Sequence, residues 1–410
     1  MKFTVLFGIA LTVVSTAAFG QSKQKPIIQV DNVKYKSNAD SNSNTKELSS
    51  FEAQMAALFR NQGFRLISTA EDDARWMSEA DILALYQSQT RFIDITDGDL
   101  ASLATNPPPA RYGLPTKPRH LKIVNEILPS ISIPKMTEWL TTFTAFKTRY
   151  YQSPTGLQSA EWLYAQALTV AASADLTAVS ISVNKFKHDW AQFSIILRIE
   201  AVNSTLPADT PVVIISAHQD STNMWNPWWG AAPGADDDGS GSCTIFEAYR
   251  VLVENGFVPH RPIEFHWYAA EEAGLLGSQK VAAKYKQDEI NVAGVFHSDM
   301  TGYTPLDGPE VIGMATDNVD SDLQDFVRKL TQVYNPDIEI IDTSCGYGCS
   351  DHASWTKAGY PAAFTFETSF KSSSPYIHST SDTVEHITFE HVEKFTRIAV
   401  GFAVELSLAN

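Results

Sequence analysis

Runs of apolar residues alternate with amphipathic stretches over most of the chain after Lys122. The continuous apolar run from Pro211 to Ala217 is typical of a strand that is buried on both faces. Similar or alternating patterns predict further strands at residues 178–186, 193–201, 263–268, 292–297 and 362–366. Helical periodicity predicts helices at residues 136–149, 159–173, 239–255, 275–285, 323–334 and 389–408. This alternation predicts an α/β fold, a three-layer sandwich around a largely parallel, mixed central sheet.

The N-terminus has the pattern of a secretory signal peptide. Lys2 supplies a positive charge, residues 3–14 are almost wholly apolar, and small residues lead up to Gly20. The alternative is a membrane anchor, but the apolar run is short for a bilayer span. We therefore expect residues 1–20 to be removed, and the protein to be secreted and extracellular without a membrane partner.

The next segment differs in composition from the rest of the chain. Residues 38–50 are rich in Ser, Asn and Asp, residues 51–99 are amphipathic, and prolines crowd residues 107–118. We expect residues 21–110 to be an N-terminal propeptide or accessory segment, and residues 111–410 to form the catalytic domain. A small permanent accessory domain remains the alternative to a propeptide.

Charge and cysteine content narrow the class of protein further. The net charge is −16 and no dense Lys/Arg cluster occurs, so we expect no nucleic-acid partner. We also expect a monomer. Cys345 and Cys349 are close enough to form a disulfide in an exported protein, whereas a two-thiolate metal site would need further Cys or His ligands, and we expect no such candidates nearby. Cys243 lies in an apolar helical stretch and is expected to be a buried free thiol.

Polar side chains that suit a metal site follow several of the predicted strands. They supply two imidazoles and three carboxylates: His218, Asp237, Glu272, Asp299 and His378. Histidine nitrogen together with carboxylate oxygen is the ligand mixture of catalytic zinc, and five such groups are enough for two ions if one carboxylate bridges them. Sites in such sheets form at the carboxyl ends of strands, where these residues fall.

Each residue taken singly has an ordinary structural explanation. Asp237 belongs to an acidic triplet that could cap the following helix, Glu272 could lie in a charged turn, and Asp299 could cap a turn. The joint occurrence of these residues, in order and at strand ends, favours the metal site. Asp220 lies two residues after His218 and therefore points to the same side of an extended chain, where it can accept a proton from the far ring nitrogen.

Six ordered segments make the resemblance to a known family specific. They are residues 216–221, 233–241, 269–274, 299–301, 345–354 and 377–378. The chain resembles the secreted co-catalytic di-zinc leucyl aminopeptidases, which belong to the same clan as glutamate carboxypeptidase. The resemblance covers about residues 125–408 and leaves the first hundred or so residues outside.

The resemblance implies a role for each matching residue. Asp237 would bridge two Zn²⁺ ions, with His218 and Asp299 on one ion and Glu272 and His378 on the other. Glu271 would be the general acid/base, and Tyr347 would help to hold the oxyanion. The implied substrates are peptides with a free N-terminus and a preferred Leu-like first residue. The apolar residues expected near the site are Met300, Phe364, Phe366, Phe370 and Ile377, although core packing is the alternative for at least half of them.

Three other functions stay open at this point. A carboxypeptidase of the same clan would need a cationic residue for the substrate carboxylate, and none stands in these motifs. A glutaminyl cyclase shares the fold but uses a single zinc, which the five-ligand set does not favour. A non-enzymatic binding module would be expected to have lost ligands.

Overall fold

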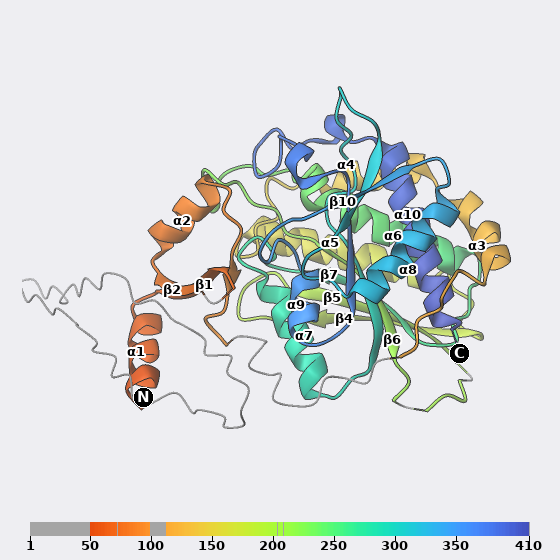
Figure 1. The fold of residues 1–410 in the computed structure, drawn as a ribbon, viewed down its shortest axis with the longest axis horizontal. Coiled ribbons are helices and arrows are strands. Elements are labelled where there is room, and N and C mark those ends of the chain that lie inside the picture. Colours follow the sequence, from red (N-terminus) through yellow and green to blue (C-terminus); the bar gives the residue numbers. More distant parts are fainter. Residues whose placement is uncertain (1–49, 72, 99–111, 203, 208, 410) are drawn as a thin grey trace, which may run out of the picture. The chain divides into compact units, whose positions relative to one another are not determined.

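A computed structural model describes residues 50–71, 73–98, 112–202, 204–207 and 209–409 (Figure 1). These residues all lie in one compact unit of the chain, Lys34–Asn410. The predicted signal peptide and the prolines at positions 107–109 lie outside the described residues. Among the helices that are described, none is long and apolar enough to cross a membrane.

The central element is a mixed sheet whose strand order is β10-β9-β11-β8-β6-β7-β5-β4. The strands are β4 (Val179–Phe186), β5 (Ser194–Ala201), β6 (Val212–His218), β7 (Ile263–Tyr268), β8 (Val292–Ser298), β9 (Val311–Ala315), β10 (Glu339–Thr343) and β11 (Ala362–Phe366). The four central strands β7, β6, β8 and β11 are parallel, whereas β5, β4 and the β9–β11 pairing are antiparallel. The predicted parallel centre of a mixed sheet is confirmed.

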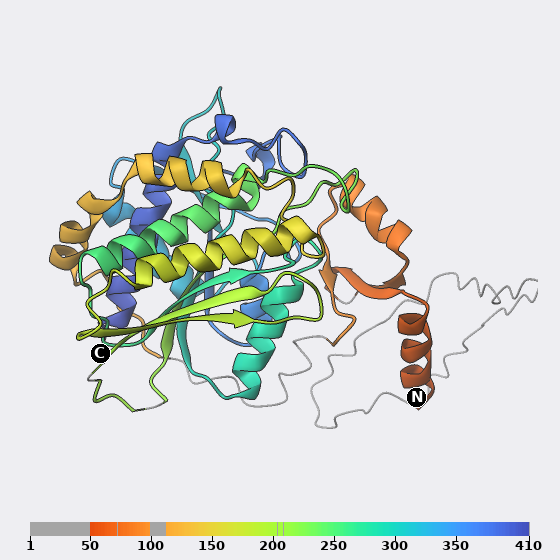
Figure 2. The same cartoon turned by 180° about the vertical axis from the view of Figure 1, so that it is seen from behind.

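Helices cover both faces of this sheet and make it the middle of three layers (Figures 1 and 2). One layer consists of α3 (Leu121–Ile127), α4 (Ile133–Phe143), α5 (Pro154–Ala171), α6 (Gly241–Glu254), α8 (Ser321–Tyr334) and α10 (Phe389–Ser407). The other contains α7 (Leu276–Gln287) and α9 (His352–Lys357). Strand β6 is apolar throughout because both of its faces are buried. Val213 and Ile215 pack under the first layer, and Val212 and Ile214 pack under the second.

Two helix boundaries differ from the predictions by more than three residues, and two strands of the central sheet were missed. Helix α4 ends at Phe143 instead of Arg149, because Arg149 turns its side chain into the interior. Helix α5 starts at Pro154, where the Ser153 side chain accepts the Gly156 N–H and proline occupies the first turn. Strands β9 and β10 have only five residues each, and β10 is partly exposed, so their patterns were too short to predict them.

Residues 50–98 form a small module of their own, called here the N-terminal module. It contains α1 (Ser50–Asn61), β1 (Arg65–Ala70), β2 (Asp73–Met77), α2 (Glu79–Gln87) and β3 (Ile93–Asp94). The three strands make a separate antiparallel sheet with the order β2-β1-β3. The amphipathic pattern predicted for this part of the chain therefore corresponds to an ordered structure.

Candidate active site

The parallel strands bring the five predicted side chains to one edge of the sheet. His218 ends β6, Glu272 lies four residues after β7, and Asp299 directly follows β8. Asp237 lies in the helical turn just before α6, and His378 lies in the loop after β11. Since β7, β6, β8 and β11 are parallel, the segments that leave their carboxyl ends meet at the same place.

Asp237 lies between the two histidines. Its Oδ1 is 3.1 Å from His218 Nε2, and its Oδ2 is 2.9 Å from His378 Nε2. On the outer sides, Asp299 Oδ1 is 3.5 Å from His218 Nε2, and Glu272 Oε2 is 3.0 Å from His378 Nε2. The five side chains therefore form two histidine–carboxylate pairs that share one central carboxylate. We call them the five-residue cluster.

Several polar atoms of this cluster are buried without a hydrogen-bond partner. They are both ring nitrogens of His218, His378 Nε2, Glu272 Oε1 and Asp299 Oδ1. Buried polar atoms are almost always paired in native proteins, so a group of orphaned nitrogens and oxygens needs an explanation. Imidazole nitrogens and carboxylate oxygens that converge in this way fit divalent transition-metal ions, zinc in particular. The residues present therefore suit the metal that the sequence predicted.

The electrostatics of the cluster also favour a bound cation. Burial opposes the charged form of His218, yet Asp299, Asp220 and Asp237 outweigh it and hold the pKa of this imidazole well above its usual value. Burial likewise opposes protonation of His378, whose pKa is nevertheless raised by Glu272 and Asp237. Too much negative charge is thus gathered in a buried space, and positive charge is required to balance it.

Asp220 positions three groups of the site at once. Its Oδ1 lies 3.4 Å from His218 Nδ1, on the side that its spacing from His218 predicted, but the two atoms do not form a hydrogen bond in this structure. The same carboxylate accepts the backbone N–H groups of Glu271 at 3.0 Å and Glu272 at 3.2 Å, which the sequence did not indicate. Asp220 therefore connects the end of β6 to the segment that follows β7.

Asp238 is a further site residue that the sequence analysis did not single out. Its carboxylate accepts backbone N–H groups from His218, Gly241 and Met300 at 3.1, 2.8 and 3.1 Å. It also lies within 4.8 Å of ligand atoms of His218 and Asp299. Three accepted N–H groups make it a structural anchor for the strand ends, whereas Asp237 keeps its oxygens directed at the histidines.

Three residues of the site adopt a left-handed backbone conformation that non-glycine residues rarely use. The φ angles of Ala270, Met300 and His378 are 58°, 60° and 55°. Hydrogen bonds hold two of these turns, since Met300 N–H donates to Asp238 and the His378 carbonyl accepts the Met224 N–H at 3.0 Å. Such strain of about 1–3 kcal/mol per residue persists only where the surrounding structure compensates for it.

The expected apolar residues gather into one cluster beside the disulfide. Met300, Phe364 and Phe366 are fully buried in it, and Phe370 and Ile377 are half-buried around them. Phe366 and Phe370 stack with ring centroids 3.9 Å apart. Phe370 and Ile377 therefore have surface that a substrate can reach. Met300, Phe364 and Phe366 belong to the core, as the alternative of core packing allowed.

Cys345 and Cys349 form a disulfide, and Cys243 is a buried free thiol, as predicted. One premise of the disulfide argument was wrong. His352, three residues after Cys349, has a ring nitrogen within 4.8 Å of both sulfur atoms, so a nearby histidine does exist. Helix α9 places it there, because its first residue is His352. The disulfide nevertheless occupies both sulfurs.

The N-terminal module contacts the two segments that carry Glu272 and Tyr347. Tyr86 Oη donates to the Glu272 carbonyl at 2.6 Å, and Arg65 Nη2 donates to the Ala273 carbonyl at 2.6 Å. The Tyr347 hydroxyl is hydrogen-bonded to Ser68 Oγ at 2.7 Å and accepts from Lys357 Nζ at 2.9 Å. Tyr347 therefore faces the module in this structure.

Glu271 differs from Tyr347 in its surroundings. Its side chain is 7% exposed and lies next to Glu272. Burial raises the pKa of the Glu271 carboxyl well above its usual value, and the nearby carboxylates of Asp351 and Asp299 raise it further. A carboxyl group in such an environment is suited to taking up and releasing protons.

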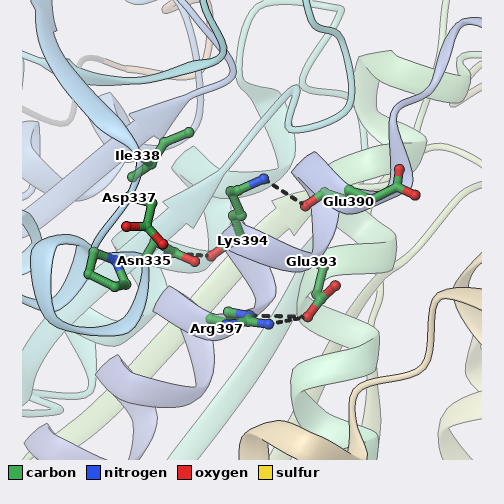
Figure 3. A pocket seen from close by; sticks show the side chains of 8 residues that line it. Asn335, Asp337, Ile338, Glu390, Glu393, Lys394 and Arg397 are labelled. Atoms are coloured by element: carbon green, nitrogen blue, oxygen red, sulfur yellow. Dashed lines mark hydrogen bonds and ion pairs between the residues drawn. The ribbon is translucent and has the colours of Figure 1, made fainter.

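A separate surface hollow has none of these features (Figure 3). It lies between the end of α8 and the start of α10, and Arg397 and Glu393 form an ion pair at its edge. Asn335 Nδ2 donates to the Lys394 carbonyl at 3.0 Å within it. Arg397 is thus paired with Glu393 and Lys394 with Glu310, and the lining residues belong to no group of convergent metal ligands among the described residues.

Comparison with known proteins agrees with this geometry. Residues 195–403 match peptidase family M28, a span that includes all five cluster residues. The chain belongs to peptidase family M28. It is similar to leucine aminopeptidase 1 of Neurospora crassa, with 42% identity over 355 residues that cover 84% of this chain and 86% of that protein. Leucine aminopeptidase 1 of Blastomyces gilchristii is 43% identical over 359 residues, covering 84% and 90%.

A solved structure from a bacterium shows the same family likeness. The aminopeptidase LapA of Legionella pneumophila is 32% identical, with a TM-score of 0.71 over 82% of this chain and 91% of that one. Membership of family M28 together with these relatives makes the chain a hydrolase, a metallo-aminopeptidase.

Proposed function

We propose that the chain is a secreted di-zinc aminopeptidase that removes Leu-like residues from the N-termini of peptides. The observation that carries this proposal is the position of Asp237, which directs one oxygen at each histidine. A carboxylate that serves two ions needs this arrangement. His218 and Asp299 would hold one zinc, Glu272 and His378 would hold the other, and Asp237 would contribute to both.

Glu271 is the proposed general base. Bound zinc would supply a water of lowered pKa and polarise the scissile carbonyl. The Glu271 carboxylate would accept the proton of that water and later deliver it to the leaving amine. Asp220 accepts the Glu271 backbone N–H and so fixes the backbone position from which the Glu271 side chain extends. Tyr347 would stabilise the oxyanion once its hydroxyl is free to turn toward the substrate.

The carboxylate-rich surroundings explain the preference for a free N-terminus. A substrate α-ammonium or amine would approach a cluster that contains Glu272, Asp237 and Asp299, where an N-acetylated terminus lacks the charge and the lone pair to bind. The half-buried faces of Phe370 and Ile377 would contact a Leu-like side chain. The Leu-like preference also agrees with the names of the fungal relatives.

Arg149 bears on the carboxypeptidase alternative because it is the buried cation near this site. Its guanidinium is fully buried, and three of its five N–H groups donate to the backbone carbonyls of Gln219, Pro233 and Gly234, so it holds the chain together and is not exposed to a substrate carboxylate. A single-zinc cyclase would leave one of the two histidine–carboxylate pairs without a use. The complete cluster likewise argues against a binding module.

We also propose that residues 1–20 are a signal peptide and residues 21–110 a propeptide that restrains the enzyme. The Ser68–Tyr347 hydrogen bond supports restraint, because it holds the hydroxyl that the mechanism needs. Cleavage in the proline-rich stretch before residue 119 should release the module and raise activity. Equal rates for the intact and the cleaved chain would contradict the restraint.

The decisive experiment combines metal analysis with two matched substrates. The purified, processed chain should contain about two zinc ions and hydrolyse leucine p-nitroanilide, but not its N-acetylated counterpart. Chelation should abolish the activity, and added zinc should restore it. Cleavage of the blocked substrate would indicate another type of peptidase, and a metal-loaded protein without hydrolase activity would refute the proposal.

A further inference from the structure

Three tryptophans of one loop are exposed to solvent beside the five-residue cluster. Trp225, Trp228 and Trp229 are 66%, 41% and 76% exposed, and they lie within residues 222–231, called here the tryptophan loop. The other six tryptophans of the chain are buried or half-buried. Large aromatic side chains gathered on a surface usually mark a place where something binds, because each ring leaves apolar area in water.

The base of the tryptophan loop is rigid. Arg149 is fully buried and binds the Gln219 carbonyl before the loop and the Gly234 carbonyl after it, both at 2.8 Å. Ser221 Oγ closes the base by donating to the Ala232 carbonyl at 2.8 Å. The two ends of the loop are therefore tied together through buried groups.

The tip of the loop is fixed as well. Asn223 is buried, and its Oδ1 accepts the backbone N–H groups of Trp225 and Asn226 at 3.0 and 3.1 Å. Its Nδ2 donates to the Ala231 carbonyl at 2.9 Å. Gly230 lies so close that an added Cβ would come within 2.6 Å of the Asn223 side chain. The rings are thus presented by an ordered turn, which lowers the entropy cost of binding to them.

The loop is continuous with the candidate active site. It begins just after Asp220 and ends a few residues before Asp237. The N–H of Met224, the residue before Trp225, donates to the His378 carbonyl at 3.0 Å. The tryptophans also remain exposed while the N-terminal module is docked, so the module does not cover them.

We propose that the tryptophan loop binds the second and third residues after the scissile bond of a peptide substrate, and that it favours ring-bearing side chains there. This inference rests on the proposed aminopeptidase function. With the N-terminal residue at the five-residue cluster, the rest of the peptide must leave across the rim, and this loop forms part of that rim. Indole faces stack with aromatic rings and pack against proline rings, so the preferred downstream residues are Phe, Tyr, Trp and Pro.

The test compares substrates that share the same first residue. Leucine p-nitroanilide, a leucyl peptide continued by glycines, and a leucyl peptide of equal length continued by glycine and two phenylalanines are given to the processed, zinc-loaded enzyme. The double variant Trp228→Ala/Trp229→Ala should lose about tenfold in kcat/KM on the phenylalanine peptide, mostly through KM. Its rates on the other two substrates should stay within about twofold.

Two further variants guard against a general structural effect. Trp229→Phe should retain most of the preference for the phenylalanine peptide, because it keeps a ring. Leu176→Ala is the matched control, since Leu176 is 60% exposed and neighbours the hollow at the far end of α6. It should change none of the three rates. Thermal unfolding of each variant should match that of the wild type.

The outcomes separate this inference from the function on which it rests. Equal loss on both peptides, or no loss on either, would overturn the assignment of a ring-binding subsite. Loss of leucine p-nitroanilide hydrolysis in the double variant would show that the loop supports the cluster and does not select downstream residues. If the wild-type enzyme failed on leucine p-nitroanilide, the proposed aminopeptidase function would fail first.

Discussion

Replacing Arg149 with lysine should weaken both the fold and the metal site. The guanidinium bridges two segments, residues 218–221 and residues 233–237, by binding carbonyls on each. It also lies over the Phe143 ring at 4.3 Å from the centroid. Burial lowers the pKa of Arg149 to about 10, so the side chain is still charged at neutral pH.

The expected magnitude follows from these contacts. A hydrogen bond from a charged donor contributes about 1.5–3 kcal/mol, and Arg149 makes three of them to backbone carbonyls, two of which are buried. A lysine places all its donors on one nitrogen and reaches one or two of these carbonyls, so at least one loses its partner. We therefore expect Arg149→Lys to lower the free energy of unfolding by about 2–4 kcal/mol.

The assay is chemical denaturation at pH 7, followed by circular dichroism, with and without saturating zinc. Arg397→Lys is the matched control, because Arg397 is only partly buried and pairs with Glu393 one helical turn away on α10; it should lose under about 0.5 kcal/mol. Zinc affinity should fall only in Arg149→Lys, since only this change loosens the tether between His218 and Asp237. An unfolding free energy within about 1 kcal/mol of wild type, with unchanged zinc affinity, would refute the bridging role.

Three further predictions test other parts of the molecule. Glu271→Ala should retain both zinc ions yet lose at least about a hundredfold in kcat on leucine p-nitroanilide, and near wild-type turnover would mean that the assigned base is wrong. Replacing Cys345 and Cys349 with serine should lower kcat clearly but change the thermal unfolding temperature little, because the disulfide no longer closes the loop that carries Tyr347. A kcat equal to that of the oxidised enzyme would contradict this. Glu310 accepts from His391 and Lys394 at 2.8 and 2.7 Å, and mainly the His391 hydrogen bond lowers its pKa from 4.5 to about 2. Its stabilisation should be present above pH 4.5 and lost as the pH falls toward 2, so Glu310→Gln should cost about 0.5–1 kcal/mol in unfolding titrations at pH 7 and almost nothing near pH 2.

Much of the fold was predictable because its signals are local. Strand β6 is apolar throughout, since both of its faces are buried, and α6 and α10 have clear helical periodicity. The five cluster residues were predictable for a related reason. In a parallel sheet the carboxyl ends of the strands converge, so residues after different strands become neighbours without any sequence proximity.

Other features depend on contacts that no local pattern encodes. Arg149 looks like the end of a helix in the sequence, and only the packing of segments 70 and 85 residues away explains why it is buried. Asp238 acts on backbone N–H groups that belong to three separate segments. The positive φ angles of Ala270 and Met300 are likewise imposed from outside, since neither residue favours such a conformation by itself.

The contacts between the N-terminal module and the rest of the chain bear on whether this module can bind related enzymes. Tyr86, Arg65 and Arg91 donate to main-chain carbonyls, those of Glu272, Ala273 and Cys349. A carbonyl oxygen is present at every position whatever the side chain, so divergence of these loops need not disturb such contacts. A module that recognises backbone in this way should dock on enzymes whose loop sequences differ, provided that the loops keep the same path. Produced as a separate polypeptide, it is therefore a starting point for a ligand directed at the family as a whole.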